Sequence, residues 1–417
     1  MTAPIYGICI EQEEIVLSRR FVAAIAGFFM MLFVGIFYAW SLFRLRLIVV
    51  FPTWTAADCS LTFTIFIMCF CAAGILGGKF SALWGRRKTL YISAALILAG
   101  GLLFTSIQTM NASSALLVTY LSYGVLCGVG AGIAYNVIIS GVSLLFPKRA
   151  GLASGILLTG FGFGSLFLGI VMEEISDAIG FFPTFRWSAI LIAALLFGGS
   201  FTFRAKEAPL AQQSSLEEDG LPPSQVLKTP KFWLYLFWVI FMSSAGLTVI
   251  NSASAIAAYF GAFAALGMIV SLFNGFSRIA IGSFCDHFGS KKSIFVNNCC
   301  AIIAGVFLLL SALMRSTPLM FLGLIIAGVS YGSTMALNAS VTKELFGRKY
   351  YSMNFSLITL SGIPASFMGP YVSGVLQDRS QGAYTTTFLA MIVFALISLI
   401  LYLFFCRSLS TKETTRR

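Results

Sequence analysis

Two stretches of ten residues, GKFSALWGRR at 78–87 and GSFCDHFGSK at 282–291, occupy equivalent places 204 residues apart. Each stretch follows one long apolar run and precedes another, and each has glycine at its first and eighth positions. Because the offset is constant, the same tight turn is expected to join the second apolar run to the third in each half of the chain. The repeat therefore predicts a protein built from two similar halves.

The composition places both halves in a membrane. Of the 417 residues, 58% are hydrophobic and only 10% are charged, whereas soluble domains carry about 25% charged residues. A helix needs about 20 apolar residues to cross a bilayer. The chain supplies twelve runs of this kind, which we expect near residues 21–43, 61–82, 89–107, 113–143, 152–171, 186–204, 232–256, 262–284, 294–314, 317–341, 351–376 and 383–405.

A polar segment separates the sixth run from the seventh. Residues 205–231 contain QQSS at 212–215 and EEDG at 217–220. Such a segment buries too little apolar surface to fold alone, and we interpret it as a cytoplasmic linker. The predicted fold is an all-α membrane protein with twelve transmembrane helices in two six-helix pseudo-repeats. The predicted organisation is a cytoplasmic tail at 1–20, six-helix bundles at 21–204 and 232–405 on either side of the linker, and a cytoplasmic tail at 406–417.

The net charge of +12 does not indicate nucleic-acid binding, because the basic residues form short clusters between the apolar runs. A DNA-binding surface needs a contiguous soluble face, and this pattern offers none. Cytoplasmic loops are rich in Lys and Arg, and 21 of the 27 Lys and Arg lie on the cytoplasmic side if both termini do. We therefore expect a multi-pass protein of the cell (inner) membrane with cytoplasmic termini. The arginines expected outside the membrane are Arg44, Arg46, Arg186, Arg315 and Arg379, which leaves Arg278 within it.

Metal and cofactor sites are not indicated by this sequence. The nine cysteines lie mostly within apolar runs, where cysteine behaves as a small hydrophobe, and none forms a Cys-x-x-Cys pair. The single histidine, His287, falls in a loop, and no nucleophile–base pair indicates a membrane enzyme. We expect a protein that is not an enzyme and that needs neither a metal nor a cofactor.

The two ten-residue stretches resemble the signature loop of the major facilitator superfamily, Gly-x-Leu-x-Asp-Arg-x-Gly-Arg-Arg/Lys, and parallel six-span repeats are the plan of that superfamily. The second copy keeps the aspartate, whereas the first has Ala82 and Leu83 where the family usually has Asp and Arg. In the family this carboxylate steadies the outward-open state, so the resemblance implies a weakened latch in the N-terminal half. The residues expected to form these conformational loops are Gly78, Gly85, Arg86, Arg87, Gly282, Asp286 and Gly289.

Other stretches, in the same order along the chain, resemble the oxalate/formate antiporter family within that superfamily. They are YAWSLF at 38–43, FPKRAGLASG at 146–155, LKTPKF at 227–232 and NGFSR at 274–278. The first, second and fourth are very similar to the family's Tyr-Ala-Trp-Ser-x-Phe, Phe-Pro-x-Lys/Arg-x-Gly-Leu-Ala-x-Gly and Asn-Gly-x-x-Arg. The resemblance covers most of the chain and implies a secondary active transporter of small organic anions that works by alternating access.

Two glycine ladders, at 128–132 and 160–164, lie inside apolar runs. A dinucleotide-binding glycine motif needs a strand–turn–helix context in a soluble unit, which is absent here. Small residues in membrane helices allow close helix approach, and we interpret both ladders as packing surfaces.

Arg278 is the most informative polar residue. It lies eight positions before Asp286, or roughly 12 Å inside the cytoplasmic end at about 1.5 Å per residue. In a core of about 30 Å it is not far from the midplane, where an arginine costs about 2.5–3.5 kcal/mol. No acidic residue lies within any predicted span core. Two interpretations remain, a structural cation bonded to backbone carbonyls and a ligand for a substrate carboxylate. The guanidinium fork favours the second, which is also the role of the matching arginine in the resembled family.

Other polar and aromatic residues in the spans are candidates for the same pocket. Asn274 lies one helical turn from Arg278, on the same face. Tyrosine hydroxyls can donate to a carboxylate while their rings exclude water, although aromatic residues in membrane helices also serve as packing or interface anchors. The remaining substrate-binding candidates on these grounds are Tyr38, Trp40, Tyr135, Asn251 and Tyr331.

Ser361 bears on the charge of the substrate. Members of the resembled family suited to dicarboxylates are expected to carry a lysine within Thr-Ala-Lys-Gly, and Ser361 occupies that lysine position in the stretch 359–362. One fixed cation balances one carboxylate, whereas a dianion leaves a charge uncompensated at low dielectric. We therefore expect a monocarboxylate of the formate, lactate or pyruvate class. Because Asn274 cannot titrate, exchange or uniport is expected rather than proton symport.

Several alternatives stay open. They are an oxalate/formate-type dicarboxylate antiporter, a proton-coupled monocarboxylate symporter, a channel and a transport-inactive membrane sensor. A cation or drug exporter is expected to place Asp or Glu inside the spans, and the predicted span cores hold none. The expected partners are the small organic anion and the lipid bilayer, with no nucleic acid, and the chain is expected to function as a monomer.

Overall fold

The computed structural model describes residues 20–146, 150–203, 220–347 and 349–413. Within these residues the ordered elements are helices, apart from an isolated bridge between Gly220 and Gly347. The prediction of an all-α protein with twelve transmembrane helices is confirmed. The twelve spans are Arg20–Val50, Ala56–Trp84, Arg86–Thr109, Ala112–Leu145, Ala153–Ile179, Phe181–Thr202, Pro230–Tyr259, Ala264–Cys285, His287–Met314, Thr317–Phe346, Met353–Arg379 and Thr385–Arg407.

Several spans are built from helical segments joined end to end. In the first six spans the named elements are η1 (Gly35–Ala39), α2 (Trp40–Val50), α3 (Ala56–Trp84), α4 (Arg86–Thr105), η2 (Ser106–Thr109), α5 (Ala112–Thr119), η3 (Tyr120–Cys127), α6 (Gly128–Leu145), α7 (Ala150–Ile179), α8 (Phe181–Gly199) and η5 (Ser200–Thr202). The remaining elements are α9 (Pro223–Val226), α10 (Pro230–Tyr259), η7 (Ala264–Met268), α11 (Ile269–Met314), α12 (Thr317–Phe346), α13 (Tyr351–Thr359), α14 (Gly362–Ser366), η8 (Phe367–Tyr371), α15 (Val372–Arg379) and α16 (Thr385–Glu413).

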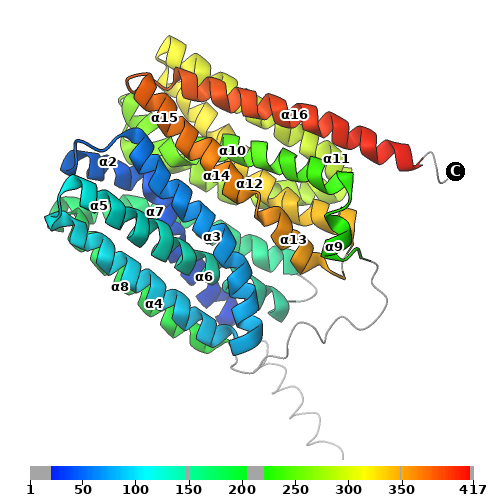
Figure 1. The fold of residues 1–417 in the computed structure, drawn as a ribbon, viewed down its shortest axis with the longest axis horizontal. Coiled ribbons are helices and arrows are strands. Elements are labelled where there is room, and N and C mark those ends of the chain that lie inside the picture. Colours follow the sequence, from blue (N-terminus) through cyan, green and yellow to red (C-terminus); the bar gives the residue numbers. More distant parts are fainter. Residues whose placement is uncertain (1–19, 147–149, 204–219, 348, 414–417) are drawn as a thin grey trace, which may run out of the picture.

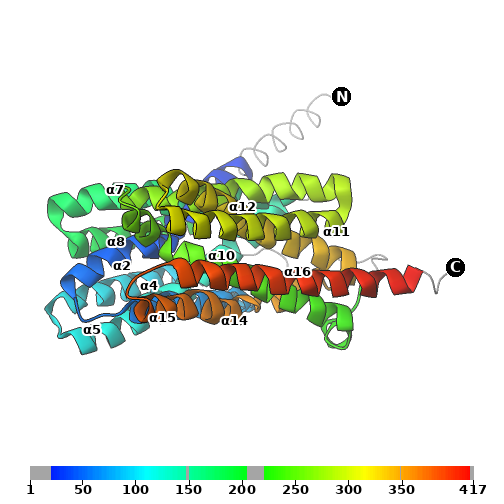
Figure 2. The same cartoon turned by 90° about the horizontal axis from the view of Figure 1, so that it is seen from above.

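The first six spans and the last six form two bundles that lie side by side (Figure 1). A view turned by 90° shows the long helices running in roughly one direction (Figure 2). Because the number of spans is even, the first span begins on the same face of the molecule on which the last one ends, and we call this the terminal face. The opposite face, which carries the connections at 51–55, 260–263 and 380–384, is the far face. The predicted boundaries of the tails, bundles and linker stay a prediction, since 1–19 and 204–219 lie outside the described residues.

The repeated turn is built alike in both halves. Gly85, between α3 and α4, has φ of 85°, and Gly289, at the kink inside α11, has φ of 81°. Residues with a Cβ rarely adopt this backbone conformation, which explains glycine at both places. The sequence repeat thus corresponds to one local structure used twice. The side chain of Asp286 lies outside the described part of the chain.

The first span extends beyond its predicted end at residue 43. It continues to Val50, so Arg44 and Arg46 lie within α2. Arg46 pairs with Glu173 and Asp177 of α7, at N–O distances of 2.9 and 2.7 Å. Arg44 is 3% exposed and bonds to residues of the other half. Acceptors on neighbouring helices bind the guanidinium groups of both arginines. The helix can therefore continue beyond the apolar stretch in which it begins. The prediction that Arg44 and Arg46 lie outside the spans is wrong, and so is the same prediction for Arg186 and Arg379, which fall within the sixth and eleventh spans.

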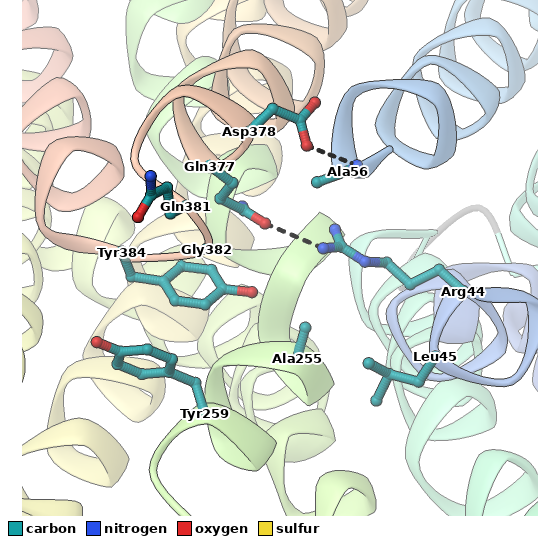
Figure 3. A pocket seen from close by; sticks show the side chains of 10 residues that line it. All are labelled: Arg44, Leu45, Ala56, Ala255, Tyr259, Gln377, Asp378, Gln381, Gly382 and Tyr384. Carbon is teal, nitrogen blue, oxygen red and sulfur yellow. Dashed lines mark hydrogen bonds between the residues drawn. The ribbon is translucent and has the colours of Figure 1, made fainter. Parts of the chain in front are cut away.

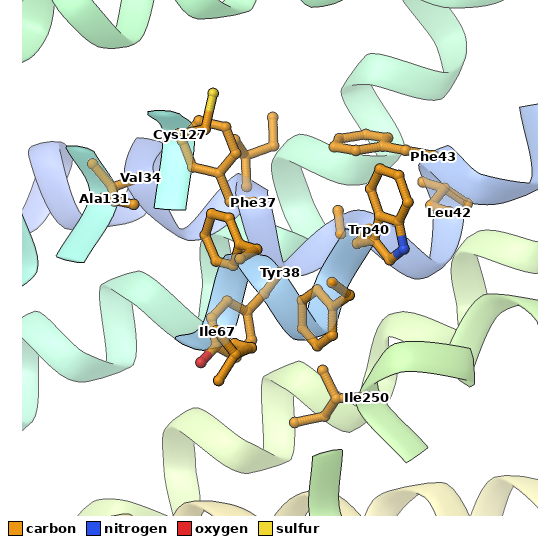
Figure 4. Packing of buried hydrophobic residues seen from close by; sticks show 14 of the residues in the cluster. Val34, Phe37, Tyr38, Trp40, Leu42, Phe43, Ile67, Cys127, Ala131 and Ile250 are labelled. Atoms are coloured by element: carbon orange, nitrogen blue, oxygen red, sulfur yellow. The ribbon is translucent and has the colours of Figure 1, made fainter. Parts of the chain in front are cut away.

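Glycines bring the first span and α7 into backbone contact. A Cβ on Gly35 would collide with the backbone oxygen of Phe161, and a Cβ on Gly164 would collide with that of Leu32. Such close crossings are typical of small residues in membrane helices. Buried aromatic rings, including those of Phe37, Tyr38, Trp40 and Phe43, pack beside this crossing (Figure 4).

Gly164→Ala should destabilise the N-terminal bundle, because the added methyl group forces the first span away from α7. Overpacking of this kind costs about 1–3 kcal/mol, and the melting temperature of the detergent-purified protein should fall by several degrees. Gly198→Ala in α8 is the matched control, since a Cβ there meets no atom within 4 Å. Equal melting temperatures for the two variants would show that the first span and α7 are not in backbone contact.

Candidate functional site

Arg278 of α11 is a buried guanidinium group with few partners. The residue is 7% exposed, and its Nη2 donates to Asn274 Oδ1 at a long 3.4 Å. Its Nε and Nη1 are buried and have no hydrogen-bond partner. Within the described residues no carboxylate pairs with Arg278, because both ion pairs found there belong to Arg46. The guanidinium group therefore offers unused donors to an acceptor from outside the chain.

Tyr331 lies beside Arg278 and links it to two tyrosines of the other half. Tyr331 of α12 lies close enough to Arg278, Tyr38 and Tyr135 for electrostatic interactions, and its side chain contacts that of Tyr38. The ring of Phe161 packs against both tyrosines of the N-terminal bundle. Its centroid lies 5.1 Å from that of Tyr38 and 5.2 Å from that of Tyr135. Tyr331 thus lies between the guanidinium group of its own bundle and two phenol groups of the other bundle.

Gly332 positions α12 for this arrangement. A Cβ at this residue would collide with the backbone oxygen of Asn274 and with Ser277 Oγ, so α12 and α11 touch at the level of Arg278. The close approach brings Tyr331, the preceding residue, near the guanidinium group. We call Arg278, Asn274, Tyr331, Tyr38 and Tyr135 the central cluster.

Ser361 lies near the partners of the central cluster. It is 3% exposed and sits at the break between α13 and α14, so it does not face lipid. A Cβ on the next residue, Gly362, would lie 2.5 Å from Cys71 Sγ on α3. Cys71 in turn interacts with Tyr38 and Tyr331. Sequence reasoning did not single out Cys71, which lies among apolar residues and carries no motif.

Two other candidates have partners away from this cluster. Trp40 donates its indole N–H to the backbone oxygen of Cys59 at 2.9 Å, and its ring centroid lies 4.5 Å from that of Tyr123. Asn251 donates to Ser60 Oγ at 2.9 Å, which joins α10 to α3. Both side chains contribute to packing between helices in this structure.

The residues predicted to form conformational loops lie toward the terminal face. Arg86 is buried, whereas Arg87 is partly buried and donates from Nε to the hydroxyl oxygen of Tyr91 at 2.8 Å. The Arg87 guanidinium carbon also lies 3.9 Å from the ring centroid of Phe201, so cation–π attraction ties α4 to η5. Gly78 and Gly282 occupy equivalent positions near the ends of the second and eighth spans.

Hydrogen bonds between the halves gather toward the far face. Asp378 of α15 accepts from the backbone N–H groups of Ala56 and Ala57, each at 2.9 Å, and so caps the start of α3. Arg44 donates to Gln377 Oε1 at 3.0 Å (Figure 3). It also donates to Ser252 Oγ at 3.4 Å. Further bonds join Ser41 to Ser254 and Thr64 to the backbone oxygen of Ser366. The halves are therefore closed against each other on this side.

Arg44 is the buried arginine among those that were expected outside the spans. Its position in YAWSLFRLRL was visible, yet the apolar run was expected to end just before it. A buried arginine with acceptors on other helices cannot be told from a loop arginine without the neighbouring spans. Among the described residues, no group of three or more His, Cys, Asp or Glu side chains could hold a metal ion.

Comparison with known proteins gives a consistent result. A family model described as Major Facilitator Superfamily matches residues 21–370 and, in an overlapping match, residues 236–416. The oxalate:formate antiporter of Oxalobacter formigenes is 25% identical over 336 residues, covering 78% of each chain. Monocarboxylate transporter 10 of Homo sapiens is 23% identical over 331 residues, covering 74% of this chain and 62% of that protein. The crystal structure of a D-xylose–proton symporter matches with a TM-score of 0.74 at 16% identity, over 94% of this chain and 97% of that one.

Proposed function

We propose, given that the chain belongs to the Major Facilitator Superfamily, that this multi-pass membrane transporter carries a small organic anion and that Arg278 binds its carboxylate. The chain is a transporter and not an enzyme. The relatives and structural neighbours described above are transporters as well. The two bundles suit transport by alternating access, in which one bundle rocks against the other around a site between them.

The observation that carries the proposal is the unused donor capacity of Arg278. Two of its nitrogens are buried without partners, and a buried charge that lacks compensation is costly. A carboxylate accepts two parallel hydrogen bonds from a guanidinium group, and these bonds are stronger than neutral ones. Tyr331, which lies near Arg278, and Tyr38, which contacts Tyr331, offer further hydroxyl donors, one from each bundle.

The substrate class follows from charge. The central cluster contains one cation and no carboxylate among the described residues, so a monoanion would make it neutral. Ser361 supplies no second charge. The names of the two relatives, an oxalate:formate antiporter and a monocarboxylate transporter, agree with a small carboxylate. We therefore propose a monocarboxylate of the formate, lactate or pyruvate class, moved by exchange or uniport.

The orientation is part of the same proposal. The basic loops of the terminal face indicate that it lies in the cytoplasm, with the far face outside the cell membrane. The boundaries of the two six-helix bundles and the cytoplasmic linker are proposed as the sequence predicts them. A single chain contains both bundles and the central cluster, so we propose that a monomer transports.

Removing the Arg278 guanidinium group should weaken anion binding. Hydrogen bonds to charged groups are worth about 1.5–3 kcal/mol, so Arg278→Gln should raise the dissociation constant for formate or lactate about tenfold to a hundredfold. Arg278→Lys keeps the positive charge but lacks the two-pronged guanidinium group. Its dissociation constant should rise less than that of Arg278→Gln. Calorimetric titration of the purified protein measures both, with Arg186→Gln, an exposed arginine of α8, as the control. Unchanged affinity in folded Arg278→Gln protein would exclude the anchoring role.

A second cation should reverse the expected preference for monoanions over dianions. Ser361→Lys places an ammonium group at the bundle interface, where it repels Arg278 in the empty state, and a dianion relieves that repulsion more fully than a monoanion. The variant should gain affinity for oxalate or malonate relative to formate or lactate. Competition against a labelled monocarboxylate measures the ratio, and Ser361→Met controls for size without charge. A wild-type protein that already prefers dianions would contradict the charge argument.

Transport should not require a proton gradient. Within the described residues no carboxylate pairs with Arg278, and Asn274, its one hydrogen-bond partner, cannot titrate. Vesicles with no internal anion should therefore show no uphill uptake when only a pH gradient is imposed. Adding internal formate should stimulate uptake if the mode is exchange. Accumulation driven by the pH gradient alone would instead show proton symport.

A further inference from the structure

Arg44 is a second buried guanidinium group, placed toward the far face. It is 3% exposed, and both of its hydrogen-bond acceptors, Gln377 Oε1 and Ser252 Oγ, are neutral atoms of the other bundle. Its Nε is buried and has no partner. Within the described residues it forms no ion pair. A charged acceptor would bind this group more strongly than the amide and hydroxyl do.

A hollow of about 450 Å³ opens beside Arg44 on the far face (Figure 3). Tyr384, 4% exposed, and Tyr259, 52% exposed, also line it. Asp378 is the one carboxylate in its lining, and both of its oxygens accept from backbone N–H groups at the start of α3. Since the helix N-terminus compensates that charge, Asp378 does not neutralise Arg44.

The first span connects this hollow with the central cluster. Tyr38, Ser41 and Arg44 follow one another at intervals of three residues, and each contacts the C-terminal bundle, through Tyr331, Ser254 and Gln377 respectively. Six residues of helix span about 9 Å. Arg44 therefore lies about 9 Å along the first span from Tyr38, on the stripe of this span that faces the other bundle.

We propose that Arg44 forms a second anion-binding site, which receives a small carboxylate at the far face before it reaches Arg278. This inference rests on the proposed function of the central cluster. When the far face opens, Arg44 parts from Gln377 and Ser252, which belong to the other bundle, and its donors become free for an anion from solution. When the face closes, these two residues replace the anion on Arg44, and the anion moves inward.

Side-resolved transport tests this site. In membrane vesicles of both orientations, Arg44→Gln should raise the half-saturating concentration of formate at least tenfold when formate is presented at the far face. The change should be less than twofold when formate is presented at the terminal face. Arg44→Lys keeps the positive charge, so its half-saturating concentration at the far face should rise less than that of Arg44→Gln. Gln377→Leu is the decisive control, because it removes a competing acceptor and keeps the cation. In the Gln377→Leu variant, the half-saturating concentration of formate presented at the far face should stay the same or fall.

If Arg44 only latches the two bundles together, Arg44→Gln and Gln377→Leu will change transport in the same direction, and the proposed site is wrong. A wild-type chain that moves no carboxylate contradicts the proposed function instead, and a labelling experiment then decides on the site. For Tyr259→Cys, the rates of modification by anionic and cationic methanethiosulfonate reagents report the charge in the hollow. Formate should lower the anionic-to-cationic ratio at least twofold, and it should have no effect when Arg44→Gln is added. A ratio that formate leaves unchanged in both proteins excludes the site.

Discussion

The burial of an uncompensated guanidinium group in an apolar helix bundle is the constraint on which the rest of this protein depends. Arg278 sits in α11 among residues that offer it one amide oxygen at 3.4 Å and leave two of its nitrogens unpaired. Such a group is costly in a membrane helix. Its neighbours Tyr331 and Asn274 are polar but neutral, so they reduce the cost without removing the charge. Under the proposed function, an anion that enters between the bundles compensates this charge.

Contacts within the bundles differ in kind from the hydrogen bonds that join the bundles near the far face. Glycines such as Gly35, Gly164 and Gly332 hold helices at backbone contact, and most of these crossings lie within one bundle. The interface between the bundles is different, because small numbers of hydrogen bonds join them near the far face. The hydrogen bonds from the start of α3 to the Asp378 carboxylate are the strongest of this group, because a charged acceptor lies at a helix N-terminus. On the terminal side the repeated turn of the first half carries Ala82 and Leu83 where the resembled family usually has Asp and Arg.

Much of this architecture follows from the sequence alone. Twelve apolar runs and a turn repeated at 78–87 and 282–291 were sufficient for the fold, because span length and glycine placement are local properties. The pairing of Asn274 with Arg278 also follows from helical spacing. The positions of Trp40 and Arg44 do not, since each depends on which residues of other helices lie opposite. Trp40 has the backbone oxygen of Cys59 as its partner, and Arg44 has Gln377, which is 333 positions away. The burial of Ser361 likewise depends on packing between α14 and α3.

Counterflow in liposomes tests the central claim most directly. Purified protein is reconstituted with unlabelled formate or lactate inside, and a trace of the labelled anion is added outside. A carrier with a carboxylate site between two rocking bundles should show transient accumulation of the label above its external concentration, and the effect should saturate as external anion increases. Label that only equilibrates, at a rate proportional to concentration and independent of the internal anion, would contradict the account.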